Sequence, residues 1–341
     1  MTRAFKVAVV GASGVVGETL IRVLEERAFP VAELFTLASQ RSLGKKVRFA
    51  GVDVPVDDLE LFDFRRAEIG FFCAGAAVSR VHVPRASAAG CIIIDNTSEF
   101  RLEEDVPLVV PEVNAELIGE YVNRGIIANP NCSTIQMVVA LKPLYDVAGI
   151  ERINVATYQA VSGAGRRAVE ELAVQSAALL AGQGPVTSQV IPKQIAFNCV
   201  PQIDEFLENG YTREEMKMLW ETRKILADPA IRVNATAVRV PVFFGHSQAV
   251  HLETRAKITA EQARTLLAKA LGIEVIDELR PGGYPTAATE AANRDTVYVG
   301  RIREDISTDR GLNLWLVADN VRKGAATNSI QIAEILVREH I

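Results

Sequence analysis

Apolar runs alternate with helical patterns along the first 130 residues of the chain. A continuous apolar run at residues 5–10 predicts a strand that is buried on both faces, and residues 19–24 predict an amphipathic helix after it. The same patterns predict further strands at residues 34–37, 68–73, 91–94 and 125–128, and a further helix at residues 77–88. Strands that alternate with helices are typical of a doubly wound parallel sheet, so the first part of the chain is predicted to be α/β.

After residue 130 the pattern becomes richer in strands. Helices are predicted at residues 135–144, 166–181 and 320–337, and strands at residues 153–160, 235–240, 248–257, 297–303 and 312–318. These runs predict a second, α+β domain with a mixed sheet. A chain of 341 residues is long enough for two such domains. We place the first at residues 1–130, joined by a C-terminal helix at 319–341, and the second at residues 131–318.

Composition narrows the class of protein. With 49% hydrophobic and 23% charged residues, the chain has the makeup of a soluble globular protein, and its net charge of −5 argues against nucleic acid as a partner. We find no apolar run of the roughly 18 to 20 residues that a membrane span needs, and no leader pattern before the first strand, so we expect a cytoplasmic protein. The cysteines have neither metal-ligand spacing nor disulfide density, which predicts reduced thiols and no metal site. They are Cys73, Cys91, Cys132 and Cys199.

A glycine-rich turn follows the first predicted strand. Residues 11–17 read GASGVVG, and glycines there let the backbone turn tightly and approach a pyrophosphate at the N-terminus of the next helix. The spacing is GxxGxxG rather than the commoner GxGxxG. The glycines alone are therefore weak evidence, and the predicted strand before them and helix after them strengthen it. Together they predict a Rossmann-type dinucleotide site. Its candidate residues are Gly11, Ser13, Gly14, Val15 and Val16.

The end of the second predicted strand distinguishes between the two nicotinamide cofactors. Residues 38–42 read ASQRS, with no carboxylate to accept a ribose 2′-hydroxyl, as an NAD site would usually have. Arg41, flanked by Ser39 and Ser42, instead offers a cation and hydroxyl donors that suit a 2′-phosphate. The sequence therefore favours NADP, with a solvated loop charge as the alternative interpretation of Arg41.

Cys132 lies where the strand predicted at residues 125–128 meets the helix predicted at residues 135–144. Unpaired backbone N–H groups in the first turn of a helix, and the positive end of its dipole, favour the thiolate form of cysteine. A lone cysteine is more often a small buried apolar residue, so position alone leaves both interpretations open. Because ligands bind at the C-terminal ends of parallel strands, we expect Cys132 to face the cofactor crevice.

Several motifs occur in order along nearly the whole chain. The main ones are GASGVVG at residues 11–17, NPNCST at 129–134, YQAVSGAG at 158–165 and RVPVFFGHS at 239–247. They are joined by PEVN at 111–114, VGRIR at 299–303 and DNVRKGAA at 319–326. In this ordered set the chain resembles the aspartate-semialdehyde dehydrogenases. The resemblance implies interconversion of L-aspartate 4-semialdehyde and L-4-aspartyl phosphate with NADP and inorganic phosphate, on the route to lysine, methionine and threonine. It also implies a homodimer whose catalytic domains pack together.

The resemblance implies covalent catalysis at Cys132. Its thiolate would attack the aldehyde, hydride would pass to NADP, and phosphate would cleave the resulting thioester. His246, which we read as part of a turn between strands, would take and return a proton, because imidazole ordinarily titrates near neutrality. Gln159, at the end of a predicted strand, would orient the acyl intermediate through its amide.

The resemblance also assigns substrate ligands. Arg239 suits bidentate binding of the substrate α-carboxylate, and Glu214 matches the ligand of the α-amino group. Lys217 should lie beside Glu214 on one helix face and would hold phosphate together with Arg101. Without the resemblance, Glu214 and Lys217 would be read as a solvated helix pair.

The remaining candidates flank these motifs. Asn131, next to Cys132, is a candidate substrate ligand, and Ser162 and Gly163 would line the nicotinamide side of the cofactor site. Asn320 would do the same from the C-terminal helix.

Three alternatives stay open. One is another acyl-phosphate reductase, such as N-acetyl-glutamyl-phosphate reductase, although an acetylated amine would have no charge for Glu214 to meet. Glyceraldehyde 3-phosphate dehydrogenase is disfavoured, since its cofactor site would be expected to have an acidic residue after the second strand. A non-catalytic relative that keeps the fold would be expected to lack Cys132, Gln159 or His246, and all three are present.

Overall fold

A computed structural model describes residues 3–341 and divides the chain into two compact units. The first unit comprises the residues through Asn131 together with Ala325–Ile341, and the second comprises Cys132–Gly324. Each unit has its own sheet and is described by itself.

The first unit is built on a seven-stranded sheet with the order β3-β4-β2-β1-β5-β6-β7. Every pairing is parallel except that of β3 with β4. The strands are β1 (Phe5–Val10), β2 (Val31–Ala38), β3 (Lys46–Phe49), β4 (Val52–Asp58), β5 (Ile69–Phe72), β6 (Ile92–Asp95) and β7 (Ile126–Ala128). The doubly wound parallel sheet predicted from the sequence is confirmed, and β1 lies at its switch point, with β2 on one side and β5 on the other.

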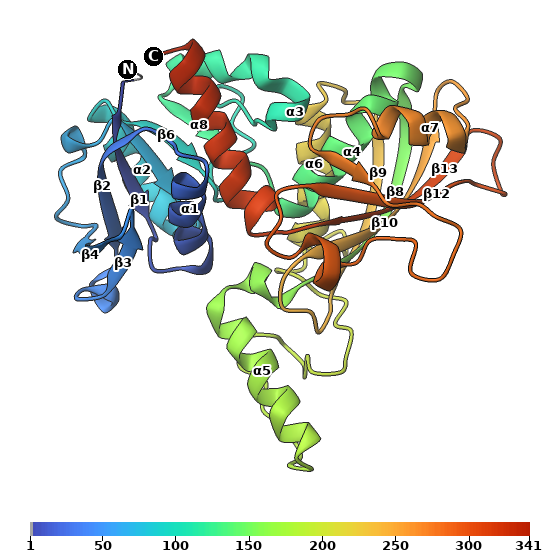
Figure 1. The fold of residues 1–341 in the computed structure, drawn as a ribbon, viewed down its shortest axis with the longest axis horizontal. Helices are drawn as coiled ribbons and strands as arrows, with labels where there is room; N and C mark the ends of the chain where they lie inside the picture. The colour runs from blue at the N-terminus through green and yellow to red at the C-terminus, as the bar shows by residue number, and fades with distance from the viewer. Residues whose placement is uncertain (1–2) are drawn as a thin grey trace. The chain divides into compact units, whose positions relative to one another are not determined.

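Helices from both ends of the chain complete this unit. The helical segments are α1 (Val15–Glu26), η1 (Gln40–Ser42), η2 (Phe64–Arg66), α2 (Ala76–Ala88), α3 (Pro111–Asn114), η3 (Ala115–Asn123) and α8 (Thr327–Glu339). Helix α8 lies beside α1 in Figure 1, and Ile330, Ala333 and Leu336 join Leu20 and Leu24 of α1 in one core. The last helix is therefore part of the first unit's core rather than an exposed tail.

The second unit contains a six-stranded mixed sheet with the order β11-β12-β13-β10-β8-β9. Its strands are β8 (Ile150–Gln159), β9 (Arg232–Arg239), β10 (His246–Thr254), β11 (Ile273–Val275), β12 (Val297–Glu304) and β13 (Gly311–Ala318). The pairs β8 with β9 and β11 with β12 are parallel, and the other pairs are antiparallel. This confirms the predicted mixed sheet.

One helix is the centre of this unit's core. The helical segments are α4 (Cys132–Ala148), η4 (Val161–Ala164), α5 (Arg166–Leu180), α6 (Arg213–Ile225), α7 (Ala260–Leu267), η5 (Ala287–Ala291) and η6 (Arg322–Ala326), the last of which ends within the first unit. Helix α4 packs against β8, β10, β12 and β13 and also contacts α6 and α7. Residues 133–141 of α4 are all buried, as expected of a helix that is covered on several faces.

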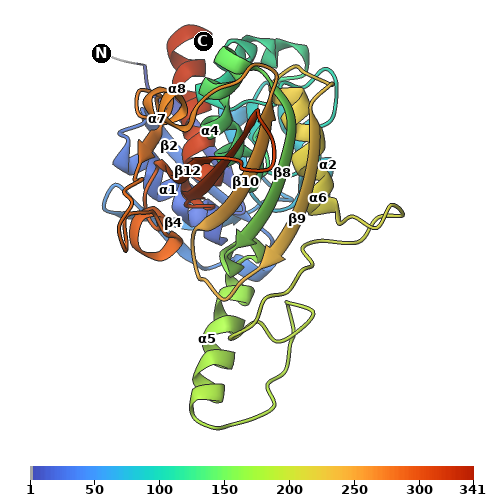
Figure 2. The same cartoon turned by 90° about the vertical axis from the view of Figure 1, so that its right-hand side faces the viewer.

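Helix α5 and the segment after it extend away from the six-stranded sheet (Figure 2). The segment is fastened to the helix by Glu171, whose carboxylate accepts hydrogen bonds from the N–H groups of Gln189, Val190 and Ile191 at 2.9, 2.7 and 3.3 Å. Gln175, one turn later, accepts bonds from the next backbone stretch through its Oε1. Two side chains of one helix thus satisfy the backbone of a long irregular connection.

Several boundaries differ from the sequence-based prediction, including those at two candidate residues, His246 and Asn320. His246 is the first residue of β10 and pairs with Ala318, so it lies in a strand and not in a turn. The helix predicted from residue 320 begins at Arg322, with a π-helical turn, which leaves Asn320 in the turn before it. His246 is held in a strand by its pairing with Ala318, against the local pattern. Asn320 is held in a turn by its side-chain contacts with Ser162 and Gly245.

Candidate active site

Three candidate residues meet at one edge of the six-stranded sheet. Gln159 ends β8 and Arg239 ends the parallel strand β9, where the two residues are register partners. His246 begins β10, which runs antiparallel to β8, so its start lies at the edge where β8 ends. The topology of β8, β9 and β10 therefore brings together side chains that are up to 87 positions apart in the sequence.

His246 is completely buried, and its two ring nitrogens have different surroundings. The Ala160 N–H donates to Nδ1 at 3.0 Å, which places the proton of the neutral ring on Nε2. Nε2 has no hydrogen-bond partner among residues 3–341 and lies 3.4 Å from where a Cβ on Gly163 would be. Burial, and to a lesser degree the charge of Arg239, lower the pKa of His246 to about 3. The ring is neutral at pH 7 and offers a free donor at Nε2.

Arg239 is a buried cation whose guanidinium, like the His246 ring, lies next to Gly163. Its Nη1 donates to the Ala160 carbonyl at 2.8 Å and lies 2.9 Å from where a Cβ on Gly163 would be. Burial lowers the pKa of the Arg239 guanidinium, while the negative charges of Glu214 and of a Cys132 thiolate act in the opposite direction. A buried guanidinium offers N–H donors in a fixed planar arrangement and is suited to bind a carboxylate.

Gly163 makes room for both side chains. We expected it to line the cofactor, and the structure places it against Arg239 and His246. Any side chain at this position would meet the Arg239 guanidinium at less than 3.0 Å. A side chain at 163 would therefore displace the end of the Arg239 side chain.

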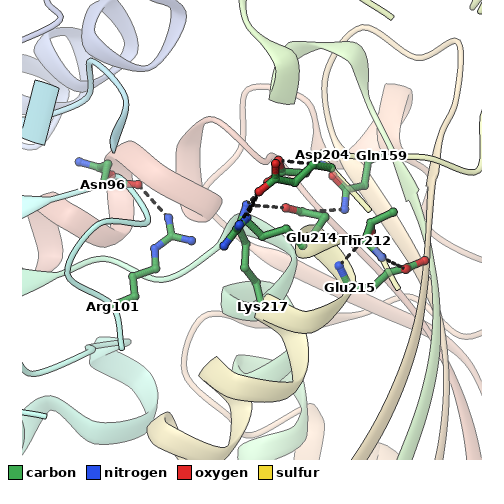
Figure 3. Close-up of polar contacts among 10 residues, drawn as sticks. Asn96, Arg101, Gln159, Asp204, Thr212, Glu214, Glu215 and Lys217 are labelled. Carbon is green, nitrogen blue, oxygen red and sulfur yellow. Dashed lines mark hydrogen bonds and ion pairs between the residues drawn. The ribbon is translucent and has the colours of Figure 1, made fainter. Parts of the chain in front are cut away.

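Helix α6 places two further candidates beside Gln159 (Figure 3). Gln159 Nε2 donates to Glu214 Oε1 at 3.1 Å, and Lys217 Nζ donates to Glu214 Oε2 at 3.3 Å, so the predicted neighbours Glu214 and Lys217 do share one helix face. Lys217 also forms a 2.8 Å ion pair with Asp204, a residue that no sequence signal singled out. Glu214 is only 5% exposed, which contradicts the alternative of a solvated helix pair.

The start of α6 is fixed by its own sequence. Thr212 and Glu215 form a capping box, in which the Thr212 side chain accepts from the Glu215 N–H and Glu215 accepts from the Thr212 N–H. Glu215 also accepts from the N–H of Ala237 in β9 at 2.9 Å. This ties the first turn of α6, and with it Glu214, to the strand that ends in Arg239.

Cys132 is the first residue of α4, which begins three residues before the helix start predicted at residue 135. It is partly exposed and lies where the partial positive charge of a helix N-terminus favours a thiolate. Gly324 packs directly against it: a Cβ built at 324 would lie 2.8 Å from the Cys132 Cβ. Gly324 belongs to the motif at residues 319–326, where the sequence had given it no role.

Asn320 connects two loops of the second unit. Its Oδ1 accepts from the Gly245 N–H at 2.9 Å and its side chain bonds to the Ser162 hydroxyl at 3.0 to 3.1 Å. Ser162 is buried and Gly245 has a φ of +90°, a conformation that suits glycine. The turn before His246 is thereby held by Asn320.

Arg101 and Asn131, two candidate substrate ligands, belong to the first unit. Arg101 is 6% exposed, and its guanidinium donates to the carbonyl of Asn129 at 2.9 Å and of Asn96 at 2.8 Å. Asn131 is equally buried and follows the short strand β7.

The glycine turn of the first unit has the shape of a dinucleotide site. Gly11 has a φ of +86°, and a Cβ on Gly17 would lie 2.3 Å from the Gly11 carbonyl oxygen. Gly14 is the N-cap of α1 and makes no side-chain cap, so the first N–H groups of that helix stay available to a phosphate. Val15 and Val16 begin the helix. The residues present therefore fit the pyrophosphate of a dinucleotide.

The end of β2 lies next to this turn. The hydroxyl groups of Ser13 and Ser42 are 2.9 Å apart, which joins the glycine turn to η1. Ser39 and Arg41 are exposed, and no ion pair is found for Arg41 in the described part of the chain. An exposed guanidinium at this point is consistent with a phosphate ligand.

The other histidines and cysteines lie outside these clusters. His82 is buried with Nε2 3.3 Å from Glu60, and burial lowers its pKa. Burial also raises the pKa of the Cys91 thiol to about 12, and Cys73 is shifted in the same direction. Residues 3–341 contain no group of three His, Cys, Asp or Glu side chains arranged to hold a metal ion, and none of their helices is long and apolar enough to cross a membrane.

Comparisons with known proteins identify two family domains in the chain. Residues 6–121 match the family model of the semialdehyde dehydrogenase NAD binding domain, and residues 141–323 match that of the semialdehyde dehydrogenase dimerisation domain. Aspartate-semialdehyde dehydrogenase from Legionella pneumophila is 60% identical over 341 residues, covering 100% of this chain and 98% of that protein.

Solved structures give the same result. Aspartate semialdehyde dehydrogenase II from Vibrio cholerae, complexed with ASA, has a TM-score of 0.97 at 58% identity and covers 100% of both chains. The Candida albicans enzyme with NADP has a TM-score of 0.75 at 27% identity and covers 98% of both chains. The chain therefore belongs to the aspartate-semialdehyde dehydrogenase family, and is an oxidoreductase that acts on an aldehyde group.

Proposed function

We propose that this enzyme interconverts L-aspartate 4-semialdehyde and L-4-aspartyl phosphate, with NADP and inorganic phosphate as co-substrates. The observation that carries the proposal is the convergence of Gln159, Arg239 and His246 at one sheet edge, where the charge of Cys132 acts on Arg239. The names of the relatives support the substrate, and the ASA complex from Vibrio cholerae supports it further.

Cys132 is the proposed nucleophile. Its thiolate adds to the aldehyde carbon and forms a C–S bond as the C=O π bond breaks, giving the oxyanion of a hemithioacetal. NADP bound at this site would supply the acceptor for the hydride from that carbon, and NADPH would supply the hydride in the biosynthetic direction. In the resulting thioester, phosphate oxygen attacks the carbonyl and the Cys132 thiolate leaves. Gln159 is the proposed residue that orients the acyl group; its two N–H groups are donated to Glu214 and to the Thr157 hydroxyl, so one of these bonds would be exchanged for a bond to the acyl oxygen.

His246 contributes a hydrogen-bond donor in the observed ring orientation. Because Nδ1 accepts from the Ala160 N–H, the ring proton is on Nε2 and can be donated to the substrate oxygen as it becomes negative. Nε2 could take up a proton only in the other tautomer, in which Nδ1 carries the ring proton and no longer accepts from the Ala160 N–H. The base role implied by the resemblance therefore requires the loss of this bond, whereas the donor role does not.

The charged substrate groups are matched by buried charges. Arg239 binds the α-carboxylate and Glu214 the α-amino group, with Lys217 holding Glu214 in place. Lys217 and Arg101 are the proposed cations that bind phosphate. Lys217 already forms an ion pair with Asp204, so phosphate would have to compete with that carboxylate for Lys217. Asn131, next to Cys132 in the chain, is a proposed further substrate ligand.

NADP is the proposed cofactor. The turn with Gly11, Ser13, Gly14, Val15 and Val16 binds the pyrophosphate, and Arg41 with Ser39 and Ser42 binds the 2′-phosphate. Ser162, Gly163 and Asn320 are the proposed neighbours of the nicotinamide. The NADP complex of the Candida albicans relative supports this choice.

We place the reaction in the cytoplasm, on the route to lysine, methionine and threonine. The match of residues 141–323 to a dimerisation domain supports a homodimer.

The test is NADPH formation from aspartate semialdehyde, with and without phosphate. We expect phosphate-dependent turnover, a strong preference for NADP over NAD, and little turnover of N-acetyl-glutamate semialdehyde, whose acetylated amine carries no charge for Glu214. Preference for the acetylated substrate would instead assign the chain to N-acetyl-glutamyl-phosphate reduction. Absence of turnover with either, together with retained NADPH binding, would indicate a non-catalytic relative.

A further inference from the structure

Gln248 connects the strand that carries His246 to the helix that begins with Cys132. It is completely buried in β10, and its Nε2 donates a hydrogen bond to the Ser133 carbonyl at 2.8 Å. Ser133 follows Cys132 in the first turn of α4. The side chain of Gln248 therefore makes a direct polar link between the two elements that carry the proposed nucleophile and the proposed donor.

The position of Gln248 in the sheet directs it to this place. Alternate residues of a strand face the same side, so Gln248 shares its face with His246, two residues before it. Thr157 of β8 is its direct partner across the sheet and faces the same side. Thr157 in turn accepts a hydrogen bond from Gln159 at 3.3 Å. Gln248 thus belongs to the row of side chains immediately behind the candidate active site.

Packing alone does not account for an amide at this position. Gln248 Oε1 is buried and has no hydrogen-bond partner among residues 3–341, so half of the amide is desolvated without compensation. An apolar side chain of the same shape would avoid this cost. Only the NH₂ end can face a carbonyl oxygen, which also fixes the orientation of the amide.

We propose that Gln248 is a positioning residue: its bond to the Ser133 carbonyl fixes the first turn of α4, and so the Cys132 sulfur, relative to His246. This inference rests on the proposed function, since it assigns Gln248 a part in a reaction at Cys132. Small displacements of reacting groups are costly, and a shift of about 1 Å can lower a rate by about a hundredfold.

The decisive variant is Gln248→Met, which keeps the length and volume of the side chain and removes the donor. The matched control is Val250→Ala, because Val250 is buried, lies on the same strand and faces the same side, two residues further from the site. The measurements are kcat, the KM for each substrate, the melting temperature, and the pH dependence of Cys132 alkylation by iodoacetamide. Cys199→Ser serves as the common background, since it removes the exposed thiol.

We expect Gln248→Met to lower kcat at least tenfold and to change the rate of Cys132 alkylation across pH, with a melting temperature no lower than that of the background protein. Val250→Ala should lower the melting temperature and leave the alkylation profile unchanged. The inference would be overturned if Gln248→Met kept the kcat and the alkylation profile of the Cys199→Ser background. It would also be overturned if Gln248→Met and Val250→Ala lost kcat equally. Alkylation does not require turnover, so it tests the role of Gln248 separately from the reaction. The proposed function fails if the Cys132→Ser variant is active, and the alkylation result for Gln248 would still stand.

Discussion

The backbone of Gly324 lies against the side chain of Cys132 so closely that a Cβ at 324 would be 2.8 Å from the Cys132 Cβ. The same Cβ would lie 3.3 Å from the Cys132 Cα, so the close contacts include the backbone of α4 as well as the side chain. Gly324 lies in the π-helical turn η6, a geometry that is frequent at functional sites. The position of the thiol is therefore set in part by the absence of a side chain at 324.

Gly324→Ala should push Cys132 out of place. We expect kcat to fall by roughly tenfold to a hundredfold, because a displaced nucleophile no longer meets the aldehyde carbon in line. The control is Gly184→Ala, where no atom lies within 4 Å of the added Cβ. Steady-state kinetics of both variants provide the check, and wild-type kcat in Gly324→Ala would show that the contact has no catalytic consequence.

His246 should make stability depend on pH on the acid side. Its pKa is about 3 in the folded protein because of burial and of Arg239, with Glu214 acting in the opposite direction, whereas the pKa of an unfolded histidine is about 6.5. Between these values the unfolded chain binds a proton that the folded chain does not. The free energy of unfolding is therefore highest, as far as His246 determines it, above about pH 6.5, and it decreases as the pH falls from there towards about 3.

His246→Gln should weaken this dependence. Urea unfolding at pH 7 and at pH 5 gives the free energy of unfolding of the variant and the wild type, and the difference between the two pH values should be smaller in the variant. His251→Gln, at an exposed histidine, is the control and should behave like the wild type. An unchanged pH dependence in His246→Gln would mean that the folded ring does titrate normally.

Arg41→Ala tests the choice of cofactor. Loss of a charge-assisted bond to the 2′-phosphate should raise the KM for NADP by roughly tenfold to a hundredfold and leave that for NAD nearly unchanged. Arg48→Ala, on the edge strand β3, removes an equally exposed cation and should affect neither. Equal changes with both cofactors would remove Arg41 from the 2′-phosphate site.

Glu171→Ala tests the hydrogen bonds that join α5 to the segment at residues 189–191. Three backbone N–H groups would lose a charged acceptor, each worth about 1.5 to 3 kcal/mol, so hydrogen exchange of these amides should become markedly faster. Glu170→Ala, at the exposed neighbour, should leave exchange unchanged. Protection that persists without Glu171 would show that the segment is ordered by other contacts.

Local patterns were sufficient to predict β1, the glycine turn and α1, because a buried strand, glycine spacing and an amphipathic helix follow one another there. The hairpin of β3 and β4 was missed, since it lies at the sheet edge and its residues are mostly exposed or partly exposed, without a clear apolar face. The short helix α7 was missed although it begins with a capping box, because its eight residues carry little periodicity.

The candidate site was predicted less completely. Its residue types and sequence positions came from the motifs, but the burial of His246 depends on β8 and β13, which pair with β10 from distant parts of the chain. Asp204 and Gln248 could not be found from sequence, because neither belongs to a motif and each acts through a contact made only in the folded chain. Gly324 had a signal in its motif, but its contact with Cys132 requires the three-dimensional structure.

The most direct test of the proposed mechanism is to incubate the enzyme with aspartate semialdehyde and NADP in the absence of phosphate and to measure both NADPH and the mass of the protein. We expect one equivalent of NADPH per chain, an acyl adduct on Cys132, and release of the adduct with resumed turnover when phosphate is added. Cys132→Ser should form neither product, and Cys199→Ser should match the wild type. Steady NADPH formation in Cys132→Ser, or phosphate-dependent turnover without an adduct on Cys132, would contradict the thioester mechanism.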